Sequence, residues 1–157
     1  MAELVQLTKV KVRKEPGKGK VKHSIIEGFP QQSIRMGLHG GVKKFYKVEA
    51  GEELPTTLDY VIAALGSCLT GTLGSALEAR QIPLGADDLT ADVQGFIENV
   101  ENKPLITRVH VKYHFKVPKD KKAEAERIVV NHDKFCAVSQ SLKRGITVEL
   151  EAEIGES

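Results

Sequence analysis

The segment from Thr57 to Gln81 constrains the fold more than any other part of this chain. Its apolar residues recur at spacings of three and four, which is the pattern of an amphipathic helix. That face consists of Leu58, Val61, Ile62, Leu65, Leu69, Leu73, Ala76 and Leu77. Thr56 and Asp59 match a capping box, so the helix should begin there. It should end near Gln81, because Pro83 cannot continue a helix.

A second face of the same segment carries only small residues. These are Ala64, Ser67, Cys68, Gly71, Gly74 and Ser75. Each glycine inside a helix costs about 1 kcal/mol relative to alanine, so a helix that keeps several of them is expected to lie close to another backbone. We therefore expect this helix to be buried, central and in contact with another helix.

The remaining segments predict a mixture of strands and short helices. Alternation of apolar and polar residues predicts strands over 5–12, 21–28, 32–38, 43–50, 87–100, 105–117 and 146–154. Helices are predicted over 118–132 and 133–145, and Gly145 should end the second one. This order does not alternate strand with helix as doubly wound folds do. It predicts an α+β fold, with helices packed on a mainly antiparallel sheet, in one domain of residues 1–157.

Composition limits the class of protein. With 157 residues, of which 41% are hydrophobic, the chain can form one globular domain with a sizeable core. The net charge of +2 argues against nucleic acid as the main partner. No uninterrupted apolar run approaches the roughly 20 residues that span a bilayer, and the N-terminus lacks a signal-peptide core. We expect a cytoplasmic protein without a membrane partner.

The chain has two cysteines, Cys68 and Cys136. In a reducing compartment such a pair is a reactive couple, part of a metal site, or two inert buried thiols. His132 and Cys136 lie one helical turn apart, which suits two metal ligands. Beyond Cys68 no further ligand is evident, because His110 and His114 fall on the polar face of a strand. We therefore expect no metal.

Two motifs carry a resemblance to a known family. LDYVIAALGSCLTGTL, residues 58–73, resembles the first cysteine motif of the OsmC/Ohr family, with an acidic residue, an alanine-rich apolar run and a cysteine. HDKFCAVSQSLKRGITVEL, residues 132–150, resembles the second motif, in which C-P-x-S precedes an apolar helix and a final strand. The order of the motifs and the separation of 68 positions between the cysteines also fit.

The resemblance implies a thiol-dependent peroxidase of the oxidative stress response that reduces organic hydroperoxides. Cys68 would be the peroxidatic cysteine and Cys136 the resolving one, with no cofactor. A dithiol, such as a lipoyl group on a partner protein, would be the reductant. The implied fold is an intertwined homodimer, with antiparallel sheets wrapped around two long central helices. The alternative is a non-enzymatic dimer of the same fold that binds a small ligand or thiol.

This chain departs from the family pattern in two places. Leu58 stands where the Ohr and OsmC branches have a glutamate, and Ala137 replaces the proline after the second cysteine. Asp59 is expected to serve the capping box. The family's arginine lies before the long helix, where this chain has Arg13 and Arg35. Arg35 is our candidate, with an ordinary surface role as the equal alternative.

Overall fold

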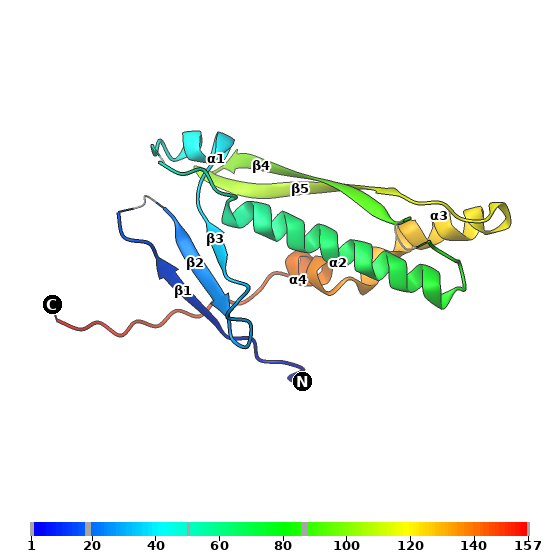
Figure 1. Cartoon of the computed structure of the whole chain (residues 1–157), viewed down its shortest axis with the longest axis horizontal. Coiled ribbons are helices and arrows are strands. Elements are labelled where there is room, and N and C mark those ends of the chain that lie inside the picture. The colour runs from blue at the N-terminus through cyan, green and yellow to red at the C-terminus, as the bar shows by residue number, and fades with distance from the viewer. Residues whose placement is uncertain (1, 18–19, 50, 86–87, 157) are drawn as a thin grey trace. The chain divides into compact units, whose positions relative to one another are not determined.

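The computed structural model describes residues 2–17, 20–49, 51–85 and 88–156 (Figure 1). The chain divides into two compact units. Unit 1 contains residues 1–62 and 94–109, and unit 2 contains residues 63–93 and 110–157. The single domain of residues 1–157 stays a prediction.

Unit 1 contains a three-stranded antiparallel sheet. Its strands are β1 (Val10–Lys14), β2 (Lys22–Ile26) and β3 (Ile34–Met36), in that order across the sheet (Figure 1). Ser24 at the centre of β2 pairs with Val12 on one side and with Ile34 on the other. The first three predicted strands are therefore confirmed, although the first one begins at Val10 and not at Val5.

The fourth predicted strand, over 43–50, is wrong in its described part, and Ala50 lies outside the described residues. The chain forms the short helix α1 (Gly40–Phe45) there. Gly40 has a φ of 51°, which turns the chain out of the extended conformation. The amides of Lys43 and Tyr46 then bond to carbonyls four residues back. These local bonds override the strand preference of the aromatic residues.

The long helix α2 (Thr57–Ala79) begins as predicted. The Thr56 amide donates to Asp59 Oδ2 at 2.6 Å, and the Asp59 amide donates to Thr56 Oγ1 at 3.1 Å, which is a closed capping box. At the other end, the Ile82 amide donates to the Leu77 carbonyl at 3.0 Å, while Gln81 has a φ of 54°. A left-handed residue after the last turn is a common way for a helix to end.

Helix α2 also has the length and apolarity of a membrane-spanning helix. Its most apolar 18-residue window has a mean hydropathy of 1.5, and 22% of that window is buried. Core helices of soluble proteins pass the same test, and Leu69, Leu73 and Leu77 of α2 are buried. The cytoplasmic location stays a prediction.

A two-stranded sheet follows α2, formed by β4 (Thr90–Val100) and β5 (Lys103–His114). Two residues join them, Glu101 with a φ of 49° and Asn102 with a φ of 61°. Positive φ at both positions is typical of a type I′ hairpin turn, so the strands run antiparallel. Both strands are confirmed, although Asp87 of the first prediction lies outside the described residues.

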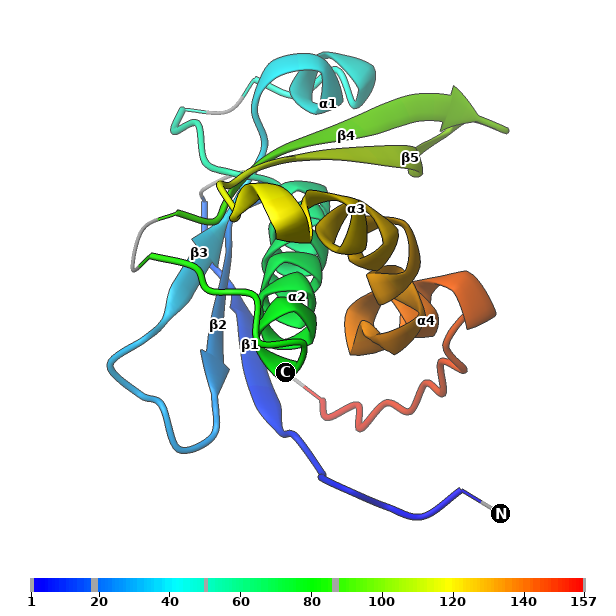
Figure 2. The ribbon, with the colours of Figure 1, turned by 90° about the vertical axis from the view of Figure 1, so that its right-hand side faces the viewer.

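The core of unit 2 forms around the C-terminal half of α2. Its buried residues are Leu73, Leu77, Ile82 and Ala125. Ala125 belongs to α3 (Lys122–Asn131), which follows the single turn η1 (Lys119–Lys121) and packs against α2 (Figure 2). A Cβ built on Gly66 would lie 2.6 Å from Val93 Cγ2, so α2 and β4 touch closely at this glycine.

The last described helical elements are η2 (His132–Phe135) and α4 (Ala137–Arg144), which ends at Gly145 with a φ of 79°. Both helices predicted after residue 118 are confirmed, with Cys136 between η2 and α4. The strand predicted over 146–154 is wrong for the single chain, since this segment forms no strand. Four apolar residues of the segment, Ile146, Val148, Leu150 and Ile154, are 70% to 92% exposed. A strand needs a neighbouring edge to hydrogen-bond with, and here none is supplied.

The small face of α2 also differs from expectation. Ala64, Ser67, Gly71 and Ser75 are exposed, and a Cβ built on Gly71 would meet nothing within 4 Å. The expectation that α2 is buried on all sides is therefore wrong for the single chain. Along this face, the start of α4 contacts α2 at Cys68.

Candidate active site

Cys68 and Cys136 meet inside unit 2. Cys68 lies in the middle of α2 and is half-buried, whereas Cys136 lies directly before α4 and is 0% exposed. The two side chains share a hydrogen bond, and both thiols are free. The fold thus brings together two residues that are 68 positions apart in the sequence.

The first backbone amides of α4 point at these two sulfurs. Amides in the first turn of a helix have no partner within the helix and are normally satisfied by a cap. The Ser139 amide donates to Cys136 Sγ at 3.4 Å, so Cys136 caps α4. The amides of Val138 and Ala137 donate to Cys68. The first three amides of α4 therefore bond to sulfur.

This environment separates the two thiols in acidity. The hydrogen bond from the Val138 amide lowers the pKa of Cys68 below its ordinary value, and the bond with Cys136 adds to this. Burial raises the pKa of Cys136, and the neighbouring Cys68 charge raises it further. The positive end of the α4 dipole also stabilises a thiolate at this place. Two neighbouring thiols, one of them with a lowered pKa, are able to form a disulfide when one is oxidised.

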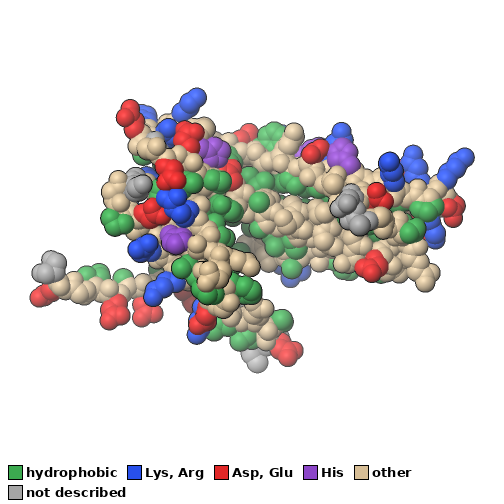
Figure 3. All heavy atoms as spheres, in the orientation of Figure 1, with side chains coloured by type: hydrophobic (Ala, Val, Ile, Leu, Met, Phe, Trp, Pro, Cys, Tyr) green, Lys and Arg blue, Asp and Glu red, His purple; other side chains and the backbone are tan. Residues whose placement is uncertain are grey.

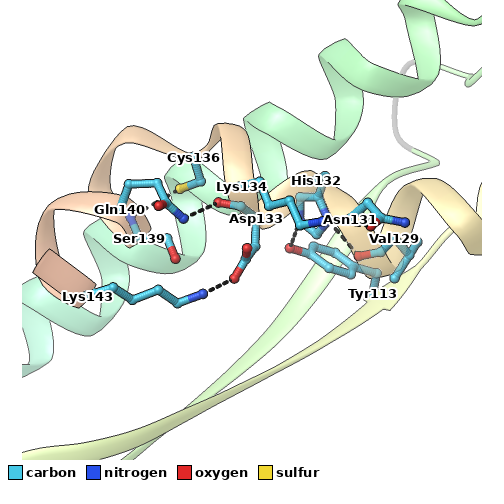
Figure 4. Close-up of polar contacts among 10 residues, drawn as sticks. All are labelled: Tyr113, Val129, Asn131, His132, Asp133, Lys134, Cys136, Ser139, Gln140 and Lys143. Atoms are coloured by element: carbon cyan, nitrogen blue, oxygen red, sulfur yellow. Dashed lines mark hydrogen bonds and ion pairs between the residues drawn. The ribbon is translucent and has the colours of Figure 1, made fainter.

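Polar contacts hold the turn that carries Cys136 (Figure 4). Gln140 Nε2 donates to the Asp133 carbonyl at 3.2 Å, and Lys143 forms an ion pair with the Asp133 carboxylate. The Gln140 amide closes the first turn of α4 on the Cys136 carbonyl at 2.9 Å. These bonds tie η2 to α4 on both sides of the cysteine.

His132 anchors the other end of η2 (Figure 4). It is buried, with Nδ1 at 2.7 Å from the Val129 carbonyl and Nε2 at 2.9 Å from the Tyr113 hydroxyl. A carbonyl accepts only, so Nδ1 carries the proton and the tyrosine donates to Nε2. Burial raises the pKa of Tyr113 to about 12, so the hydroxyl keeps its proton. Both ring nitrogens are occupied, and no group of three or more metal-binding side chains exists among the described residues.

Cys68 opens into a pocket of about 1130 Å³ that α2, α3 and η2 line. Thr72 and Ser75 follow Cys68 along the α2 wall, and His132 and Phe135 belong to the opposite wall. The Thr72 hydroxyl donates to the Cys68 carbonyl at 2.8 Å. A substrate could therefore approach the sulfur from this pocket.

Arg35, the third predicted site residue, lies in unit 1 on β3. Its guanidinium binds two carboxylates, with Nε at 2.8 Å from Glu15 Oε1 and Nη2 at 2.8 Å from Glu52 Oε2. These hydrogen bonds raise the pKa of Arg35 further above its already high value. These two ion pairs could not be predicted from the sequence, because Glu15 and Glu52 belong to separate segments.

Asp59 has the role that the sequence predicts. Its carboxylate accepts hydrogen bonds from Thr56 and lies 2.8 Å from His39 Nε2. The hydrogen bonds from Thr56 lower its pKa against the effect of burial. Through these contacts, the Asp59 carboxylate caps the start of α2.

The fold and the site define a class of protein: α+β proteins with two neighbouring free thiols at the start of a helix. The family model for OsmC-like protein matches residues 50–151, so the chain belongs to the OsmC-like family. No curated protein sequence matches it.

Solved structures of the family share the fold. An OsmC-like protein of unknown function from Vibrio cholerae has 14% sequence identity and a TM-score of 0.68, over 87% of this chain and 94% of that one. The OsmC-like protein from Mycoplasma pneumoniae has 12% identity and a TM-score of 0.65, over 89% of each chain. The organic hydroperoxide resistance protein OhrB of Bacillus subtilis has 14% identity and a TM-score of 0.58, over 89% of this chain and 93% of that one.

Proposed function

We propose that this protein is a thiol-dependent peroxidase that reduces organic hydroperoxides. The observation that carries the proposal is the position of both thiols at the start of α4, where backbone amides stabilise a thiolate on Cys68. Family membership and solved neighbours named for organic hydroperoxide resistance support the same class of substrate.

In the first step the Cys68 thiolate attacks the terminal oxygen of the hydroperoxide. An S–O bond forms, the O–O bond breaks, and the alkoxide takes a proton to leave as an alcohol. The peroxide is reduced by two electrons, and Cys68 becomes a sulfenic acid. The α4 amides favour this step because they hold the sulfur in its nucleophilic form.

In the second step Cys136 attacks the Cys68 sulfur. An S–S bond forms, hydroxide leaves and, with the proton from Cys136, becomes water. An external dithiol, such as a lipoyl group on a partner protein, then opens the disulfide by exchange and is itself oxidised. The hydrogen bond between the thiols supports this step, because it makes the two side chains neighbours.

We assign Arg35 the role of a cation that assists peroxide binding, with Glu15 and Glu52 fixing its guanidinium. We also propose that the protein works as an intertwined homodimer. The exposed small face of α2 and the unpaired segment 146–154 support this assembly, since a second chain would bury both.

The test is consumption of cumene hydroperoxide coupled to oxidation of dihydrolipoamide. The wild-type protein should turn over, and Cys68→Ser should be inactive at every pH. Cys136→Ser should react once and accumulate the sulfenic acid, which dimedone traps. Mass spectrometry of the wild-type protein after one equivalent of peroxide should find a Cys68–Cys136 disulfide. Full activity of Cys68→Ser would remove the mechanism.

The alternative function is a non-enzymatic dimer that binds a small ligand or thiol. Two observations favour it: Leu58 replaces the family glutamate, and Asp59 is engaged in capping α2. This function predicts that peroxide consumption stays at the uncatalysed rate and that both thiols remain free after mild peroxide treatment.

A further inference from the structure

His132 is a buried titratable residue that the proposed mechanism leaves without a role. Its side chain is 5% exposed, and its two ring nitrogens bond to the Val129 carbonyl and the Tyr113 hydroxyl. A buried hydrogen-bonded pair can often be replaced by apolar side chains of the same shape at little cost in stability. What such a pair adds is direction, because hydrogen bonds fix the orientation of the groups that make them.

The segment whose orientation is fixed here is η2, the four-residue turn directly before Cys136. Turns of the 3-10 type have poor internal hydrogen-bond geometry, so outside contacts are needed to keep their shape. His132 begins η2 and attaches it to α3 through Val129 and to β5 through Tyr113 (Figure 4). The rings of Tyr113 and His132 also pack edge to face, with their centroids 5.4 Å apart. The start of η2 is therefore held by two neighbouring elements of unit 2.

This hydrogen-bonded pair lies close to the buried cysteine. Burial raises the pKa of Tyr113, and the negative charges of Cys136 and Asp133 raise it further, so the tyrosine hydroxyl is within electrostatic reach of the Cys136 sulfur. Cys136 is 0% exposed and shares a hydrogen bond with Cys68. Because Cys136 directly follows η2, a shift of this turn would move its sulfur relative to that of Cys68.

The position of Cys136 matters because the Cys68 sulfenic acid has two possible fates. A disulfide forms only when both sulfurs meet in a specific geometry, so the attack by Cys136 depends on how firmly it is held. Cys68 also opens into a pocket, from which a second hydroperoxide can reach it. In that side reaction the sulfenic sulfur gains an oxygen atom, the hydroperoxide leaves as an alcohol, and Cys68 becomes a sulfinic acid that thiols do not reduce.

We propose that Tyr113 and His132 are positioning residues for Cys136. Their hydrogen bond holds η2 so that Cys136 stays beside Cys68, and it thereby favours disulfide formation over loss of Cys68 as the sulfinic acid. The positioning is a property of the two thiols and is measurable without peroxide. Its protective effect rests on the proposed function.

The first test measures the equilibrium between the dithiol and the disulfide in mixtures of reduced and oxidised dithiothreitol, without peroxide. Tyr113→Phe removes the hydroxyl and keeps the ring. Its disulfide should be about fivefold less favoured than that of the wild type, the factor that one net hydrogen bond corresponds to, because a looser η2 loses more freedom when the disulfide forms. The double variant with His132→Gln should lose no more than His132→Gln alone, since both changes break the same bond.

The second test adds an excess of cumene hydroperoxide and measures the sulfinic acid at Cys68 by mass spectrometry. Tyr113→Phe should accumulate about fivefold more sulfinic acid than the wild type, because only the second step is slowed. The rate of the first oxidation, followed as peroxide consumed in a single turnover, should be unchanged. Thr56→Ala is the matched control for both tests, because it also removes one hydrogen bond but belongs to unit 1. It should behave as the wild type.

Three results would overturn the proposal. One is a dithiothreitol equilibrium of Tyr113→Phe equal to that of the wild type. Another is an equal shift in Thr56→Ala, which would assign the effect to lost stability and not to position. Equal amounts of sulfinic acid in Tyr113→Phe and the wild type would refute the protective effect. A wild-type protein that consumes no peroxide would instead refute the proposed function, and the dithiothreitol equilibrium would still decide the positioning.

Discussion

Ala137 supplies a backbone N–H that a proline at the same position would not have. Its amide and that of Val138 donate to Cys68, while Ser139 serves Cys136. The family pattern has proline at this position, so alanine provides one more hydrogen-bond donor to the Cys68 thiolate than proline would. At the scale of single residues, this is the departure with the clearest chemical consequence.

Replacing Ala137 with proline should raise the pKa of Cys68. Proline is tolerated at the first helical position, and the extended conformation of Cys136 (φ −78°, ψ 113°) suits a following proline. In the wild-type protein, the rate at which iodoacetamide alkylates Cys68 should begin to rise at a lower pH than the rate for an ordinary thiol. In Ala137→Pro the inflection should move to higher pH, with several-fold slower reaction at pH 7.

Ala137→Ser is the matched control, because residue 137 is exposed and serine keeps the amide. Its alkylation profile should follow that of the wild type. Identical profiles for Ala137→Pro and wild type would show that this amide does not stabilise the thiolate.

The sequence was informative about the two cysteines and uninformative about what surrounds them. The motifs around Cys68 and Cys136 could be recognised from local spacing. The hydrogen bonds of Cys68 to α4 could not, since backbone amides leave no mark in a sequence except at proline. Arg35 was a candidate from its place in the chain, but its partners Glu15 and Glu52 depend on tertiary folding.

At the scale of elements, helix α2 is the best-predicted part of the molecule. The capping box of Thr56 and Asp59 and the breaker Pro83 are local signals, so its ends could be predicted closely. The segments 43–50 and 146–154 are both predicted as strands, and the described residues of neither segment form one. In the first segment, local helical hydrogen bonds outweigh the strand propensity of the residues. In the second segment, no neighbouring strand is present to pair with.

Thr56→Ala should lower the free energy of unfolding by about 1 kcal/mol, because it removes the hydroxyl that caps the Asp59 amide. Chemical denaturation followed by circular dichroism measures this. Thr57→Ala is the control, since Thr57 is exposed and makes no capping bond among the described residues. Equal effects of the two substitutions would mean that the capping box contributes nothing to stability.

Gly66→Ala should destabilise the protein by about 1–3 kcal/mol. The new Cβ would lie 2.6 Å and 3.1 Å from the two methyl groups of Val93, which is a stiff β-branched residue. The double variant with Val93→Ala should be less destabilised than the sum of the single changes, because the obstructing methyl groups are gone. Strict additivity would contradict the contact.

At the scale of the whole molecule, the single chain leaves apolar surface without cover. The segment 146–154 carries both hydrophobic and acidic side chains and is exposed along its length (Figure 3). Its alternating pattern is that of a strand with one face buried. A second chain would supply the missing edge, which is the reason for the dimer in the proposed function.

Removal of residues 146–157 should therefore abolish the dimer. Sedimentation velocity at micromolar concentration should find the full chain as a dimer and the chain ending at Gly145 as a monomer. Two single substitutions test the same interface more finely. Val148→Lys should weaken the dimer. Glu149→Lys changes the opposite face of the segment and should leave the dimer intact. A full-length chain that sediments as a monomer would contradict the assembly.

The helix start that holds the two sulfurs also has a thermodynamic consequence. Its amides attract the Cys68 sulfur most strongly when it carries a negative charge, and that charge vanishes once the disulfide forms. The reduced protein therefore gains an electrostatic contribution that the oxidised protein lacks, which moves the reduction potential of the couple to a more positive value. A disulfide of this kind gives up its bond readily, so even a mildly reducing dithiol would be able to regenerate the protein.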